Sequence, residues 1–263
     1  MNSLLLGTAS LLLIVPTIAT AQDAKPRPED TEQWSPAVQV VLPGTFEPAP
    51  PPSDAIVLFD GTSLDHWESV ENGGPAGWTV ADGIVTVAKK AGNIQTRQSF
   101  GSYQLHLEYR IPANITGTGQ ARGNSGLFLA STGKGDRGYE LQILDSYQNN
   151  TYVNGQAGSV YKQHPPLANP VRKPGEWQTI DVVWNKPVFA ADGTVKAPAT
   201  VTAFINGVLV QNQAVLRGET VYIGKPTYSA YDRAPIKLQA HGDPSAPISF
   251  RNIWVREIHD AGD

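Results

Sequence analysis

Short runs of alternating apolar and polar residues, separated by turn-forming residues, fill the chain from Asp54 onward. In the most regular run, every second residue from Tyr103 to Ile111 is apolar. Successive side chains of a β-strand point to opposite faces, so this run predicts a strand with one face in a core. The intervening residues are expected to face water, namely Gln104, His106, Glu108 and Arg110. His106 is therefore expected at the surface and not in a binding site.

Tight turns mark where such strands end. Asp82-Gly83 and Asn206-Gly207 each separate two apolar runs, and glycine tolerates the positive φ that two-residue hairpin turns require. A longer loop around Asp192-Gly193 is expected to join a further pair of strands. No long stretch shows an apolar period of 3.6 residues. About a dozen strands and no helix predict an all-β protein, folded as a two-sheet antiparallel sandwich.

Three segments are expected along the chain. Residues 1–21 are mostly apolar, too short to span a bilayer comfortably, and end in Ala19-Thr20-Ala21, which predicts a signal peptide cleaved after Ala21. Residues 22–53 carry eight of the 21 prolines, which favours an extended arm that either projects or straps across the domain surface. Residues 54–263 would form the sandwich. The mature protein is expected to be periplasmic or secreted, with no membrane span.

Composition narrows the classes of partner. The chain has no cysteine, so disulfides and thiolate metal sites are excluded and the core alone must stabilise an exported fold. Lys and Arg number 20 against 24 Asp and Glu, with no basic run, which argues against nucleic acid and anionic membranes as partners. The six Trp, nine Tyr and seven Phe suit an all-β protein that binds sugars, although core packing explains most aromatic residues in most proteins.

Two predicted strands carry polar residues on a shared face. In the strand predicted at 138–145, Glu140 and Gln142 point to the same side. A half-solvated outer strand would explain this pattern when it occurs once. The strand predicted at 237–242 repeats it, however, with three polar residues on one face: Lys237, Gln239 and His241. Two such strands lining one concave face would form a polar cleft.

Several familiar catalytic patterns are missing from the sequence, including HExxH, GxSxG, the Walker loop and the Rossmann fingerprint. A paired-carboxylate glycosidase site on the 138–145 strand is also disfavoured. Glu140 and Asp145 would lie roughly 16 Å apart on a regular strand, whereas a retaining pair needs about 5–5.5 Å. The five histidines are scattered, and no cofactor is evident. A divalent cation such as Ca²⁺ remains open, because carboxylates and amides can bind it without a fixed spacing.

Six sequence blocks resemble a known family. They occur in the order and approximate spacing of the 3-keto-disaccharide hydrolase domain, which the chain resembles from about Ala55 to Glu257. The blocks are Leu58–Trp67, Gly123–Phe128, Gly138–Asp145, Lys173–Trp177, Leu238–Gly242 and Phe250–Ile253. That family is similar in fold to the concanavalin A-like lectins and glucanases, which implies a jelly-roll sandwich.

The resemblance implies a hydrolase for 3-keto-glycosides and 3-keto-disaccharides, whose C3 hydroxyl another enzyme, a glycoside 3-dehydrogenase, has already oxidised. The ketone acidifies the C2 hydrogen, so a base can remove it, the enolate can expel the aglycone from C1, and water can then add. Such a site needs one base, donors for the enolate oxygen and an acid for the leaving group. One carboxylate among amides, a histidine and cationic donors meets that need.

Candidate roles follow from the resemblance and the two polar strands. Glu140 is the favoured base or acid-base and His241 the alternative, because histidine titrates near neutral pH whereas glutamate needs burial to raise its pKa. Arg122 and Lys162 would stabilise developing negative charge, although a solvated loop lysine is the simpler expectation for Lys162. Asp145 would orient a loop or bind a cation beside the substrate. The remaining expected contacts to the sugar are Asn124, Gln142, Tyr161 and Gln239.

Two other functions remain open at this level. A non-catalytic, lectin-like carbohydrate-binding module would need aromatic and amide contacts but no poised base. Glu140→Gln would then abolish turnover in an enzyme and leave much of the affinity of a lectin. A calcium-stabilised structural or adhesion domain would melt earlier with a chelator and bind no glycan.

Overall fold

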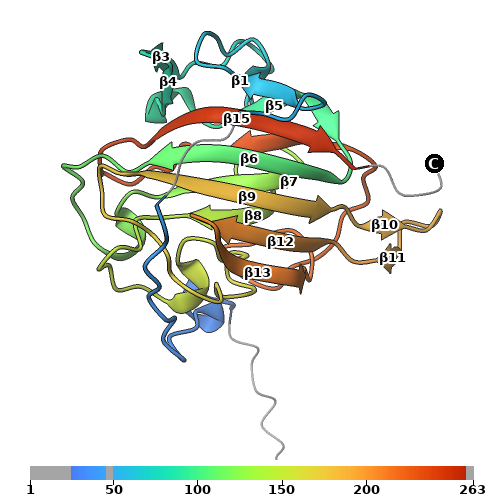
Figure 1. Ribbon diagram of the computed structural model, residues 1–263. Helices are drawn as coiled ribbons and strands as arrows, with labels where there is room; N and C mark the ends of the chain where they lie inside the picture. Colours follow the sequence, from blue (N-terminus) through green and yellow to red (C-terminus); the bar gives the residue numbers. More distant parts are fainter. Residues whose placement is uncertain (1–24, 46–49, 259–263) are drawn as a thin grey trace, which may run out of the picture.

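The computed structural model describes residues 25–45 and 50–258 (Figure 1). Strands make up 38% of the described residues and helical turns 6%, which confirms the predicted all-β class. The helical content of the described residues consists of four short 3₁₀ turns: η1 (Pro28–Thr31), η2 (Lys89–Ala91), η3 (Gly119–Ala121) and η4 (Val153–Gly155).

The larger of two antiparallel sheets has eight strands. They are β1 (Ile56–Phe59), β3 (Thr79–Ala81), β4 (Ile84–Thr86), β6 (Tyr103–Arg110), β9 (Trp177–Asn185), β12 (Thr200–Ile205), β13 (Val208–Val215) and β15 (Ser249–Glu257). Their order is β13-β12-β9-β6-β15-β4-β3, with β1 also paired to β15. This sheet faces the viewer in Figure 1.

The smaller sheet lies behind the larger one and has five strands (Figure 1). They are β2 (Trp67–Ser69), β5 (Ile94–Phe100), β7 (Ser125–Ser131), β8 (Gly138–Ile143) and β14 (Ala234–Leu238). Their order is β2-β5-β14-β7-β8, so β8 lies at an edge. A separate hairpin joins β10 (Val188–Phe189) and β11 (Val195–Ala197). The predicted two-sheet antiparallel jelly-roll sandwich is confirmed.

The predicted tight turns form at their expected positions. Asp82 and Gly83 join β3 to β4 with φ of 52° and 74°, and Asn206 and Gly207 join β12 to β13 with φ of 52° and 76°. Positive φ at both turn residues matches the right-handed twist of the strands that each turn connects. These local signals therefore fix the register of two hairpins.

One face of β6 follows the predicted alternation and the other does not. The five alternating apolar residues from Tyr103 to Ile111 are buried in the core, as expected. On the opposite face, however, His106 and Glu108 are also buried, so the prediction of a surface histidine is wrong. The reason is pairing across strands: His106 Nδ1 lies 2.7 Å from Asp181 on β9, and Arg251 on β15 donates to Glu108 at 2.6 Å.

Residues 25–45, which we call the N-terminal strap, lie on the surface of the sandwich. Val40 pairs with Asn169 in a parallel bridge, supported by Val41 N donating to the Asn169 carbonyl at 3.1 Å. Further along the strap, Arg172 donates to the Gly44 carbonyl at 2.7 Å. This part of the Pro-rich arm therefore lies across the domain surface and does not project from it.

The predicted signal peptide, residues 1–21, lies outside the described residues. Within the described part of the chain, no helix is long and apolar enough to cross a bilayer.

Candidate active site

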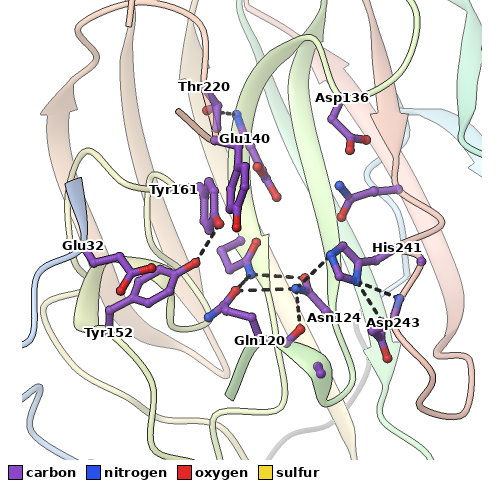
Figure 2. Close-up of a pocket in the computed structure, with 15 residues that line it drawn as sticks. Glu32, Gln120, Asn124, Asp136, Glu140, Tyr152, Tyr161, Thr220, His241 and Asp243 are labelled. Atoms are coloured by element: carbon purple, nitrogen blue, oxygen red, sulfur yellow. Dashed lines mark hydrogen bonds and ion pairs between the residues drawn. The ribbon is translucent and has the colours of Figure 1, made fainter. Parts of the chain in front are cut away.

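A cavity of about 750 Å³ lies over the face of the smaller sheet that points away from the core (Figure 2). Glu140 and Gln142 on β8 line it. Their neighbours Tyr139, Leu141 and Ile143 point the other way and are fully buried between the sheets. The alternation of β8 therefore places its polar residues in the cavity.

The chain beyond β14 supplies the facing side of the cavity. β14 pairs with β7, which pairs with β8. Gln239 N donates to the Gly126 carbonyl at 3.0 Å and so continues this pairing past the end of β14. Gln239 and His241 line the same cavity as Glu140. The two polar strands thus form one polar cleft, as their sequences predict.

The Glu140 carboxyl lies above Gly126, which has no side chain to displace it. A Cβ on residue 126 would stand 2.6 Å from Glu140 Oε1 and 2.9 Å from Phe128 Cε2, closer than carbon atoms tolerate. Burial, followed by the negative charge of Asp136, raises the pKa of Glu140 to about 8 against the opposing charge of Lys237. At neutral pH the carboxyl is therefore mainly protonated and able to donate a proton.

His241 lies on the other side of the cavity from Glu32, with its imidazole beside Asn124 (Figure 2). Its Nδ1 lies 3.0 Å from Asp243 Oδ2, and its Nε2 lies 3.4 Å from Asn124 Nδ2. Asn124 Nδ2 donates to the Gln120 carbonyl, so it is an amide nitrogen and Nε2 must accept from it. Although the Asp243 amide also lies 3.2 Å from Nδ1, the Asn124 contact favours the proton on Nδ1. Nε2 is then the basic nitrogen.

Asp243 holds this tautomer in place. Its carboxylate accepts from the Ser245 amide at 2.8 Å and forms an ion pair with Lys89 at 3.2 Å. Burial alone would raise the pKa of Asp243, but the hydrogen bonds from Ser245, His241 and Lys89 outweigh it and keep that pKa below its usual range. Asp243 is therefore ionised and stabilises a proton on the histidine ring.

Amide side chains line the cavity between the two polar strands. Gln142 Nε2 donates to Gln120 Oε1 at 3.0 Å and to Asn124 Oδ1 at 3.2 Å. Among the described residues, the buried Oε1 atoms of Gln142 and Gln239 have no hydrogen-bond partner. A buried acceptor without a partner costs free energy, so these atoms are suited to accept from hydroxyl groups of a ligand.

Two tyrosines complete the wall beside β8. The hydroxyls of Tyr152 and Tyr161 lie 2.7 Å apart, and both residues line the cavity. Tyr161 N donates to the Glu140 carbonyl at 3.2 Å, which places that ring next to the acid. Burial raises the pKa of Tyr152 to about 12 and that of Tyr161 well above its usual range, so both remain neutral hydroxyl donors.

Arg122 and Asp145, two expected substrate contacts, do not line the cavity. They form an ion pair in which Arg122 Nε lies 2.7 Å from Asp145 Oδ2, with Asp145 fully buried. Asp145 N also donates to the Gly123 carbonyl at 3.2 Å. The alternative that Asp145 orients a loop fits this position, since the loop leads into Asn124. Arg122 is neutralised by its partner and is not placed to stabilise charge on a substrate.

Lys162 is likewise not among the residues that line the cavity. Its side chain is buried, which contradicts the expectation of a solvated loop lysine. Lys162 Nζ donates to the Pro28 carbonyl at 2.7 Å and to the Tyr222 carbonyl at 3.1 Å. It therefore fastens the N-terminal strap to the domain.

Lys237 shares a strand face with Gln239, but its side chain binds a loop and does not line the cavity. Its Nζ donates to three carbonyls, those of Gly133, Gly135 and Arg137, at 2.7–3.1 Å. These contacts fix the loop that carries Asp136, which lines the cavity near Glu140 (Figure 2). Lys237 thus positions the charge that helps raise the pKa of Glu140.

Several cavity residues were not anticipated from the sequence: Glu32, Gln120, Asp136, Tyr152, Thr220, Tyr222 and Asp243. Only Asp243 carried a local signal, because it follows His241 by two residues. The others come from loops or from the strap, and contacts between segments far apart in the sequence bring them together. Thr220, for example, accepts from Glu140 N at 2.9 Å.

In residues 25–45 and 50–258, no three His, Asp or Glu side chains gather closely enough to hold a metal ion. A requirement for a divalent cation held by other oxygen ligands stays a prediction.

The chain is similar to a known family and to several solved structures. The family described as 3-keto-alpha-glucoside-1,2-lyase-like domain matches residues 54–256. No curated protein matches the chain significantly. A candidate glycosyl hydrolase from Parabacteroides distasonis, known as a crystal structure, is 51% identical over 88% of this chain and 96% of its own, with a TM-score of 0.76.

Two further candidate glycosyl hydrolase structures from the same species are more distant. They are 19% and 21% identical, each over 78% of this chain and over 94% and 99% of their own, with TM-scores of 0.54 and 0.56. At that identity the likeness concerns the sandwich fold alone.

Proposed function

Because this chain belongs to the family of 3-keto-alpha-glucoside-1,2-lyase-like domains, we propose that it cleaves glycosides whose C3 carries a ketone. The family and the 51%-identical candidate glycosyl hydrolase support a glycoside-acting enzyme in general. The observation that carries the finer proposal is the pairing of two groups in one cavity. Glu140 is a buried acid with a pKa of about 8, and the His241 ring is oriented by Asp243 at Nδ1 and by Asn124 at the basic Nε2.

The first step is an elimination. His241 Nε2 takes the C2 proton, which the neighbouring ketone makes acidic, and the electron pair forms a C1–C2 double bond as the C1–oxygen bond breaks. The protonated Glu140 carboxyl gives its proton to the departing aglycone oxygen. The pKa of about 8 keeps Glu140 protonated near neutral pH, as an acid for the leaving oxygen requires.

Negative charge that develops on the C3 oxygen needs hydrogen-bond donors. The amides of Asn124 and Gln142 already donate within the protein. Among the described cavity residues, the amide nitrogen of Gln239 makes no such bond, and one hydroxyl of the Tyr152–Tyr161 pair keeps its proton for a ligand. Such donors stabilise an enolate without a change of charge on the protein. The Gln239 amide and the tyrosine pair therefore take the role that was expected of Arg122 and Lys162.

The second step restores a saturated sugar. Glu140, now ionised, accepts a proton from a water molecule that adds to C1, and protonated His241 returns its proton to C2. The sum of both steps is hydrolysis, with a free 3-keto sugar and the aglycone as products. Both residues return to their starting protonation states.

The substrate requires an earlier oxidation of the C3 hydroxyl. We propose that a glycoside 3-dehydrogenase supplies it, as the resemblance implies, and that both reactions occur outside the cytoplasm if residues 1–21 act as a signal peptide.

A substrate panel tests this function directly. The mature protein is assayed on 3-keto-glycosides and on their unoxidised parents, with and without a divalent cation. We expect a 3-keto sugar from the oxidised substrates alone. Glu140→Gln should lower kcat by about 100-fold or more, whereas Glu176→Gln, an exposed glutamate outside the cavity, should leave it unchanged.

The same assay in D₂O separates elimination from direct hydrolysis. In elimination, the proton held on His241 exchanges with the solvent before it returns, so deuterium is added to C2 of the product beyond the exchange of the product incubated alone. Equal turnover of oxidised and unoxidised substrates would contradict the proposal. Sugar binding without turnover of any substrate would favour the carbohydrate-binding module.

A further inference from the structure

The N-terminal strap precedes the segment that matches the family, residues 54–256, yet it reaches the cavity. Glu32, directly after η1, lines the cavity and is half-buried. The strap therefore adds a carboxylate to a site whose other lining residues belong to the domain.

The backbone on both sides of Glu32 is held by one buried side chain. Asn154 Nδ2 donates to the Thr31 carbonyl and Asn154 Oδ1 accepts from Gln33 N, each at 2.9 Å. Val153 N also donates to the Gln33 carbonyl at 2.6 Å. Because Asn154 is fully buried, water does not compete for these bonds, and Glu32 is presented at a fixed place.

Aromatic rings surround the strap at this end of the cavity. Trp34 packs edge-on against Tyr152, with ring centroids 6.1 Å apart. Lys162, which binds the strap at Pro28, lies 4.6 Å from the ring of Tyr222 and 5.5 Å from that of Tyr152. Rings beside a fixed carboxylate offer both apolar surface and a strong acceptor, a combination suited to a sugar ring and its hydroxyls.

Glu32 and His241 lie on opposite sides of the cavity, with Glu140 between them (Figure 2). In the proposed reaction His241 acts on C2 of the oxidised ring, and Glu140 acts on the oxygen that leaves C1. The part of the substrate beyond that oxygen must then extend away from His241, toward Glu32.

We propose that Glu32, with Tyr152 and Tyr222, forms a subsite for a hydroxylated aglycone such as a second sugar. This inference rests on the proposed function for the direction in which the substrate lies. The Glu32 carboxylate accepts hydrogen bonds from aglycone hydroxyls, and the tyrosine rings contact the ring faces. The strap thereby makes the enzyme selective for disaccharides over glycosides with small apolar aglycones.

The test compares a 3-keto-disaccharide with the methyl 3-keto-glucoside, which has no hydroxyl on its aglycone. Glu32→Gln should raise KM for the disaccharide about tenfold, as expected for loss of a charge-assisted hydrogen bond. It should change kcat/KM for the methyl glycoside less than about twofold. Glu29→Gln is the matched control, because Glu29 is an exposed glutamate on η1 that does not line the cavity.

Calorimetric titration with the disaccharide, which needs no turnover, accompanies the kinetics. Weaker binding by Glu32→Gln, with wild-type binding by Glu29→Gln, supports the subsite. This holds even if neither substrate is cleaved, a result that would overturn the proposed function but not the subsite. Equal effects of Glu32→Gln on both substrates, or wild-type affinity and KM in that variant, would overturn the subsite and leave the proposed function standing.

Discussion

At the scale of single residues, the chemistry depends on the groups that set the pKa of Glu140. The carboxyl is removed from water over a glycine, and the negative charge of Asp136 acts on it. Lys237 compensates only in part, because its charge lowers the pKa of Glu140 by less than burial and Asp136 raise it. The result is an acid that keeps its proton at neutral pH.

The pH dependence of activity follows from this protonation. We expect kcat/KM to fall as the pH rises through about 8, because the protonated form of Glu140 donates to the leaving oxygen. The measurement is a pH profile of kcat/KM for the wild type and for Glu176→Gln, which should share this limb. A rise through the same pH would instead identify ionised Glu140 as the base and reverse the two proposed roles.

Alternation within a strand was enough to predict which residues of β8 share a face, and hence the positions of Glu140 and Gln142. The residues that tune them were beyond prediction. Asp136 reaches the cavity because Lys237, about 100 residues away, holds its loop. Lys162 and Arg122 looked like free cations in the sequence, but each has partners that only the folded chain brings near.

At the scale of strands, the outer face of β6 carries a buried polar network. His106 stacks on Trp254 with ring centroids 5.3 Å apart, and Glu108 accepts from Arg251 and Asn252. The sequence gives no local sign of this burial, because the partners of His106 and Glu108 are 75 and 143 residues away. Sheet order, which sets those pairs, was not predictable from alternation.

This network predicts a pH dependence of stability. Burial alone would lower the pKa of His106, but its hydrogen bond to Asp181 and the negative charge of Glu108, 3.8 Å from Nε2, outweigh this and raise that pKa to about 9. A folded-state pKa above the unfolded value, about 6.5, gives stability that is fully present below that value and lost as the pH rises through about 9.

His106→Gln should therefore lower the free energy of unfolding at pH 6 by about 1–3 kcal/mol, and by less at pH 10. Denaturant unfolding at both pH values measures the difference, and His66→Gln provides a control at an exposed histidine. An equal loss at both pH values would mean that ring packing on Trp254, and not the charge, stabilises this face.

At the scale of the whole molecule, segments far apart in the sequence cover the edge strand β8. Residues 158–159 exchange backbone hydrogen bonds with Gln142 at 2.9 Å, and Thr220 binds the backbone at Gly138 and Glu140. An uncovered edge would invite pairing with other chains. The segment 146–175 packs against this edge and binds the strap through Val153, Asn154 and Asn169, which its composition does not indicate.

Docking of the strap should depend on Asn154, which bonds to the strap on both sides of Glu32. Asn154→Leu removes both hydrogen bonds and leaves the Gln33 amide without its acceptor, so amide exchange across residues 25–45 should become faster. KM for a 3-keto-disaccharide should rise together with that exchange, because Glu32 is no longer held in the cavity.

Hydrogen–deuterium exchange with mass spectrometry measures this, and Asn185→Leu, at an exposed asparagine that bonds to Thr200, is the control. Unchanged exchange in the strap of a folded Asn154→Leu variant would mean that the contacts at Asn169 and Lys162 suffice to hold it. Faster exchange with an unchanged KM would mean that docking of the strap does not contribute to substrate binding. The strap would then only cover the tyrosine end of the cavity.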